Sequence, residues 1–118
     1  MTDRIEVPEW RRLVDRAKHL ISLKRPEEAR HYAARAAAMA PGEARPLCVL
    51  AIATSDLGQH EVALEQAAQA IALEPELDWP HRVRGLVLIE MKRYKDAVAA
   101  GQVDAYDDAP EYLPRLFL

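Results

Sequence analysis

The residues that could carry acid–base, nucleophilic or metal chemistry are spread along the chain without an informative spacing. His19, His31, His60 and His81 fall in four different predicted helices or turns, and the sequence has no His-x-x-x-His or Cys/His zinc spacing. Cys48, the single cysteine, has no histidine at a spacing typical of a nucleophile pair, so we interpret it as a buried structural thiol. The sequence therefore predicts no catalytic residues, no cofactor and no metal.

The pairs of acidic residues have a structural explanation. Glu27 and Glu28 follow Pro26 at a predicted helix start, where acidic side chains interact favourably with the positive end of the helix dipole. We therefore expect the protein not to be an enzyme, and turn to the elements that the chain encodes.

Composition and charge limit the class of protein. Half of the 118 residues are apolar but only 6% are aromatic, and alanine, the best helix former, supplies much of the apolar content. Together with the lack of alternating β-branched runs, this predicts an all-α fold. A net charge of −3 argues against nucleic-acid or membrane-surface binding, and MTDRIEVPEW lacks the apolar region of a signal peptide. We expect a cytoplasmic protein that binds neither nucleic acid nor membrane.

The chain repeats itself with a period of 34 residues. Small residues recur at this spacing, as at Ala29, Ala63 and Ala97, and so do the prolines Pro41 and Pro75. The period divides the chain into units 10–43, 44–77 and 78–111 of one domain spanning 1–118. Each unit is predicted to contain two helices, the first near 8–24, 45–57 and 79–92 and the second near 26–40, 60–73 and 94–106.

This pattern resembles the tetratricopeptide repeat, a 34-residue helix–turn–helix unit. The middle unit matches best, with Gly58 at the turn, Ala63 and Ala70 at small positions and Pro75 at the stop. The first unit lacks the turn glycine and has Lys24 in its place. The resemblance implies an all-α, right-handed α-solenoid of three helix-turn-helix repeats with a C-terminal capping segment, in which stacked units share one elongated core.

The third unit departs from the pattern after Ala100. Gly101 interrupts the predicted helix, Asp104 stands where an alanine is expected, and the chain continues into the apolar segment 111–118, EYLPRLFL. Three interpretations stay open for this segment. It folds back as a cap over the end of the stack, it docks into a groove of this or a neighbouring chain, or it has no fixed structure.

The resemblance implies that a peptide partner lies on the concave surface lined by the first helices. There the carboxylate clamp of some family members is not expected, because the matching positions carry one charge and no asparagine. The helical spacing predicts instead an apolar strip with arginines at one edge, and such strips mark interaction sites. The predicted partner-binding residues are Arg45, Val49, Ile52, Trp79, Arg82, Val83, Leu86 and Ile89. Trp79 either anchors the partner or packs against the preceding unit near Leu77.

Three functional hypotheses follow. The first is a protein-interaction scaffold that binds an apolar peptide or helix of unknown identity in its groove. The second is a structural module that forms a homodimer through the C-terminal tail or the open end of the stack. The third is an accessory subunit whose tail contributes to an enzyme partner's site.

Overall fold

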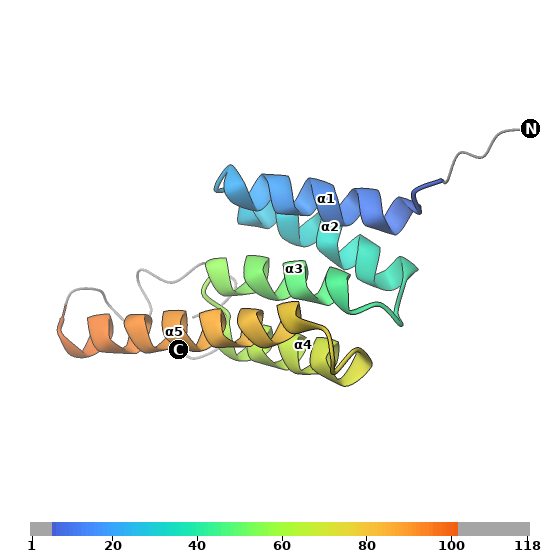
Figure 1. Cartoon of the computed structure of the whole chain (residues 1–118). Coiled ribbons are helices and arrows are strands. Elements are labelled where there is room, and N and C mark those ends of the chain that lie inside the picture. Colours follow the sequence, from blue (N-terminus) through green and yellow to red (C-terminus); the bar gives the residue numbers. More distant parts are fainter. Residues whose placement is uncertain (1–5, 102–118) are drawn as a thin grey trace, which may run out of the picture.

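The computed structural model describes residues 6–101, and within that range the protein contains five α-helices and no strands (Figure 1). The all-α prediction is confirmed. The helices are α1 (Glu9–Ser22), α2 (Pro26–Met39), α3 (Ala44–Asp56), α4 (His60–Leu73) and α5 (Asp78–Ala99). The first four agree with the predicted ranges to within two residues.

The first four helices form two antiparallel pairs, α1 with α2 and α3 with α4 (Figure 1). Each pair is joined by a turn with one residue in the left-handed region, Lys24 with φ 63° and Gly58 with φ 92°. In each turn the backbone N–H of this residue donates to a carbonyl three positions back, at Ile21 and Ser55. The first unit therefore makes the same turn as the second without glycine, although a side chain in this conformation is strained.

Alanine lets the paired helices approach closely. α2 places Ala29, Ala33 and Ala36 toward the core, and α4 places Ala63, Ala67 and Ala70 at the same three positions. All six are fully buried. Their spacing of four and then three residues puts them on one face of each helix, so the two units are built on the same contact. This packing is consistent with a helical repeat.

The core consists of two clusters that meet at α3. The first joins α1 and α2 to Val49 and Ala53 of α3, and the second joins α4 and α5 to Ala44, Cys48 and Ala51 of the same helix. α3 therefore faces the first pair on one side and the rest of the chain on the other. The start of α3 is tied to the end of α4, because the Ala44 N–H donates to Glu74 Oε1 at 2.8 Å.

The third unit differs from the prediction. Two helices were expected, near 79–92 and 94–106, but α5 continues without a turn from Asp78 to Ala99. The turn position, occupied by Lys24 and Gly58 in the first two units, is Lys92 here and is helical. In the first unit Pro26 follows the turn and disfavours helical backbone at Arg25, whereas the second unit has glycine. The stretch MKRYKD has neither, so the helix continues.

The unit boundaries at Ala44 and Asp78 coincide with the first residues of α3 and α5. The predictions for the segment after Gly101, including the second half of the helix predicted near 94–106 and the cap or docking of 111–118, lie outside the described residues.

Candidate partner-binding site

A pocket of about 340 Å³ lies where α1, from Trp10 to Lys18, meets the first turns of α3 and α5. Three of its residues, Arg11, Arg45 and Trp79, occupy one position of the 34-residue period, at the second or third residue of their helices. The repeat thus brings residues distant in sequence to one place. The complete lining is Trp10, Arg11, Val14, Asp15, Lys18, Arg45 and Trp79.

The lining combines aromatic rings with positive charge. Lys18 Nζ lies 5.3 Å from the centre of the Trp79 ring, and the Arg11 guanidinium lies 5.7 Å from that of Trp10. Both distances are within the range of cation–π attraction. The lining carries three basic side chains, the third being Arg45, and one acid, Asp15. Its net charge is positive, although that of the whole chain is −3.

These basic groups are available to a ligand. Arg11, Lys18 and Arg45 form no ion pair with another described residue, whereas some basic residues elsewhere, such as Arg30 with Glu27, pair with an acid on the same helix. An acidic group entering the pocket would meet cations that need not first break a salt bridge. Val14, 5% exposed, supplies an apolar floor.

Of the predicted binding residues, Arg45 and Trp79 line this pocket. Trp79 is half-buried and packs against both core clusters, in agreement with the packing role considered for it, while its role as a partner anchor stays a prediction. Its indole is therefore held in place before any ligand arrives. Trp10 was not among the predicted residues, because its position at the pocket is recognisable only once α1 is seen to lie beside the starts of α3 and α5.

The prediction that Val49 and Val83 bind a partner is wrong, because neither side chain is exposed. They are 34 residues apart, and each packs in the core, Val49 with the α1–α2 cluster and Val83 with the α3–α4 cluster. The helical spacing placed them on an inward face, but that face is covered by the preceding unit. Their role is to join neighbouring units, and a partner cannot reach them.

The other predicted binding residues do not line the pocket. Leu86 and Ile89 are 56% and 54% exposed on α5, and Ile52 is half-buried against the core. Arg82 is exposed and pairs with Asp78 one turn earlier, at 3.5 Å. Such surface pairs are weak, so Arg82 is only loosely held. An apolar strip therefore exists along α5, but it is shorter than expected without the two valines.

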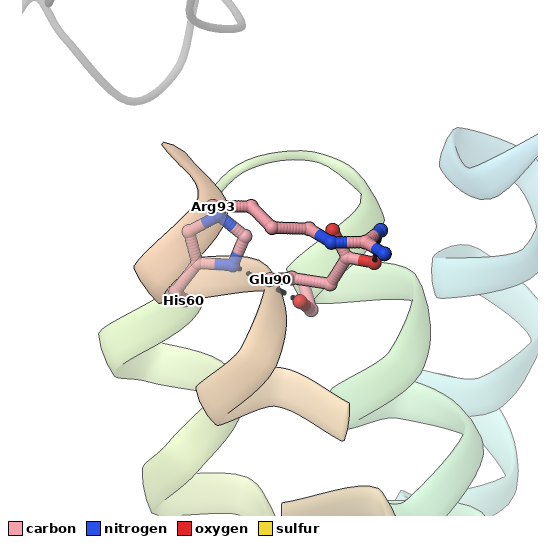
Figure 2. Close-up of polar contacts among 4 residues, drawn as sticks. His60, Glu90 and Arg93 are labelled. Carbon is pink, nitrogen blue, oxygen red and sulfur yellow. Dashed lines mark hydrogen bonds and ion pairs between the residues drawn. The ribbon is translucent and has the colours of Figure 1, made fainter. Parts of the chain in front are cut away.

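A second polar cluster lies at the turn between α3 and α4, where it meets the middle of α5. Ser55 Oγ and His60 Nδ1 are hydrogen-bonded at 3.0 Å, and Glu90 pairs with Arg93 at 3.4 Å beside them (Figure 2). Burial lowers the pKa of His60, with Glu90 acting in the opposite direction. Burial also raises the pKa of Asp56, Glu90 raises it further, and Lys24 lowers it.

This cluster has a structural role. Ser55 is only 7% exposed, and its backbone carbonyl accepts the Gly58 N–H of the turn. His60 is the first residue of α4, and its ring also lies 6.2 Å from that of Tyr94. These contacts fix the α3–α4 turn against α5. The prediction that His60 is a packing residue at the helix turn agrees with this arrangement.

Cys48 is fully buried in the second core cluster. Burial raises the pKa of its thiol to about 12, and the nearby Glu74 carboxylate acts in the same direction. The thiol is therefore protonated at neutral pH and poorly nucleophilic, as expected of a structural cysteine.

Among the residues that the structure describes, no group of three or more histidine, cysteine, aspartate or glutamate side chains is placed to hold a metal ion. In the same part of the chain, no helix has the length and apolar character required to cross a membrane.

Comparison with known proteins does not assign this chain to a family. No protein-family model, no curated protein and no solved structure matches it.

Proposed function

We propose that this protein is a tetratricopeptide-type interaction module, a right-handed solenoid whose first helices bind a peptide or helix of another protein. The support is internal to the chain. The α1–α2 and α3–α4 pairs share the left-handed turn, the three buried alanines of the second helix and the 34-residue register. Arrays of such units present a continuous surface to a partner.

The pocket at Trp79 carries the proposal. It joins an immobilised indole, which suits an apolar or aromatic side chain, to three unpaired basic groups, which suit a carboxylate. The exposed Leu86 and Ile89 continue the apolar surface along α5. The partner is thus an apolar peptide or helix that carries at least one acidic residue close to its anchoring side chain.

A selection from a displayed library of random peptides tests this proposal. We expect the retained sequences to combine leucine or an aromatic residue with aspartate or glutamate. A fluorescently labelled member of the selected set then gives dissociation constants by anisotropy. Retained peptides without acidic residues, or no retained peptides, would contradict the proposed chemistry.

Two charge reversals locate the site on the protein. Lys18→Glu, which changes an exposed lysine beside the Trp79 ring, should weaken binding at least tenfold, a loss of about 1.4 kcal/mol. Arg35→Glu is the matched control, since Arg35 is exposed on α2 and does not line the pocket. Equal effects of the two substitutions would show that binding depends on net charge and not on this pocket.

The substitution Leu86→Glu tests whether the bound partner also contacts α5 beyond the pocket. A partner that continues along α5 should bind this variant several-fold less tightly, with the helix content unchanged because Leu86 is mostly exposed. Unchanged affinity for Leu86→Glu together with a loss for Lys18→Glu would confine the site to the pocket.

A further inference from the structure

α2 covers one face of α1, and α4 lies on the equivalent face of α3. No described helix covers the equivalent face of α5. This open face consists of His81, Gly85 and Leu88, one helical turn apart. The corresponding residues of α1, Leu13, Ala17 and Leu20, are all buried beneath α2. Those of α3, Leu47, Ala51 and Thr54, are half-buried or buried, and Leu47 and Ala51 lie in the cluster that contains the alanines of α4.

On α5 no described helix covers Gly85 and Leu88, while the His81 ring is hydrogen-bonded to the Pro75 carbonyl at 3.0 Å. Leu88 is 43% exposed and its neighbour Ile89 is 54% exposed. A Cβ added to Gly85 would meet nothing within 4 Å, although Ala17 and Ala51 at the same position are fully buried. The open face thus has a small residue, Gly85, that would allow another segment to pack closely against α5. None of residues 6–101 packs there.

The backbone after α5 turns as it does after α1 and α3. Gly101 has φ 77°, and its N–H donates to the Val98 carbonyl, as Lys24 and Gly58 donate to Ile21 and Ser55. The preceding residue, Ala100, donates to the carbonyl four positions back, as Leu23 and Leu57 do. In the first two units this turn sends the chain back along the helix it has just left (Figure 1).

The residues that follow Gly101 are long enough to reach the open face. Leu88 lies thirteen positions before Gly101, about 20 Å at ~1.5 Å per helical residue. A returning helix would need about thirteen residues to span this distance, and an extended segment about six. The sequence provides residues 102–118, whose last six include the large apolar residues Leu113, Leu116, Phe117 and Leu118.

Charge along the path is complementary. The part of α5 between Leu88 and Gly101 exposes Lys92, Arg93 and Lys95, of which Lys92 pairs with Asp96 and Arg93 with Glu90, so the stretch carries one more basic than acidic side chain. The first residues after the turn contain Asp104, Asp107 and Asp108, ahead of the apolar residues. A returning segment would set its acids against the basic part of α5 and its apolar residues against the open face.

We propose that residues 111–118 of the same chain cover the open face of α5, with Leu113, Leu116 and Phe117 over Gly85 and Leu88. The segment takes the place that α2 and α4 take on the earlier helices. The third unit is thereby closed by its own chain, and the partner surface on the other side of α5 stays accessible.

Cross-linking in the full-length chain tests this proposal. Leu88→Cys combined with Leu116→Cys, treated with a short bismaleimide, should give an intramolecular cross-link. The matched control is Leu86→Cys with Leu116→Cys, since Leu86 is also exposed but lies two positions away, on roughly the opposite side of the helix. We expect the first pair to react at least tenfold faster. Cys48 is fully buried and should not compete.

The other outcomes overturn the proposal. Equal rates for the two pairs would mean that the segment is not seated on this face. A cross-link between two chains would assign the face to a second copy, through a swapped segment or, if Leu88→Cys alone gives the dimer, through direct contact of two α5 helices.

A labelling measurement does not depend on the cross-link geometry. In a full-length Leu88→Cys variant, replacing Leu113, Leu116 and Phe117 by serine should speed maleimide labelling of Cys at position 88 several-fold. The same replacement should leave labelling of the Leu86→Cys variant unchanged. No acceleration at position 88 would contradict the proposal even if the cross-linking variants failed to fold.

Discussion

At the scale of single residues, similar side chains have different roles because of where the helices place them. Trp79 and Val83 lie one turn apart on α5, yet the indole lines the pocket while the valine is sealed in the core. His60 is half-buried at a turn where its ring accepts or donates one hydrogen bond to Ser55. Its protonation is therefore linked to the stability of the fold.

The pKa of His60 leads to a prediction on pH. Burial lowers this pKa from the ordinary value of 6.5, so the folded protein binds a proton at this site less readily than the unfolded chain. The contribution of neutral His60 is fully present above about pH 6.5 and is lost as pH falls through the lowered pKa. His60→Gln should reduce the fall in the free energy of unfolding between about pH 7.5 and 5.5, measured by urea titration.

His31→Gln is the control for this measurement, since His31 is exposed on α2 and should keep the wild-type slope. Asp56 acts in the opposite sense, because its pKa is raised by burial and its contribution is lost as pH rises above the ordinary value of 3.8. A wild-type slope in His60→Gln would show that another group causes the pH dependence.

At the scale of elements, the residue at the turn position of the repeat, and the backbone conformation it adopts, differ among the three units. It is a strained lysine in the first unit, a relaxed glycine in the second and an ordinary helical residue in the third, at Lys24, Gly58 and Lys92. The residues around each position decide between turn and helix, and the same substitution should therefore have opposite effects at the two lysines.

Lys24→Gly should stabilise the protein by about 0.5–1 kcal/mol, because glycine adopts positive φ without the steric cost of a side chain. Lys92→Gly should destabilise it by about 1 kcal/mol, the cost of glycine inside a helix. Both values are to be measured as changes in the urea midpoint at constant slope. An increase in stability for Lys92→Gly would show that a turn forms there and that α5 is divided.

The alanine faces of α2 and α4 set the distance between paired helices. Ala33→Leu should cost about 1–3 kcal/mol because no space exists for the larger side chain at this fully buried position. Ala34→Leu, one residue along on the exposed side of α2, should change stability by less than about 0.5 kcal/mol. Thermal unfolding followed by circular dichroism compares the two, and similar effects would refute close packing at Ala33.

At the scale of the whole molecule, α3 couples the two halves. It contributes to both core clusters, and Trp79 packs against both as well. Unfolding of either half removes apolar cover from α3 and so destabilises the other half.

We therefore expect a single cooperative transition. Fluorescence of Trp10→Phe, which reports on Trp79, and of Trp79→Phe, which reports on Trp10 in the first unit, should give urea midpoints that coincide with the loss of helix in the same variant. A lower midpoint for the Trp10 signal than for helix content would show that α1 and α2 unfold independently of the rest.

The sequence alone determined the helical class, the 34-residue period and the ends of the first four helices. These depend on local chemistry, on alanine spacing, on glycine at a left-handed turn and on proline in first turns, which act within a few residues. The same local reasoning was wrong at Lys92, where the period predicted a turn but the surrounding residues favour helix.

Only the tertiary structure decided which inward-facing residues are exposed. Helical spacing gives a direction from the axis, but burial depends on what lies in that direction, and the preceding unit covers Val49 and Val83. The pocket could not be read from one unit, because it unites the starts of α1, α3 and α5. The open face of α5 likewise could not be recognised from the sequence. Its residues occupy the same positions of the 34-residue repeat as the covered faces of α1 and α3, and only the structure shows which faces are covered.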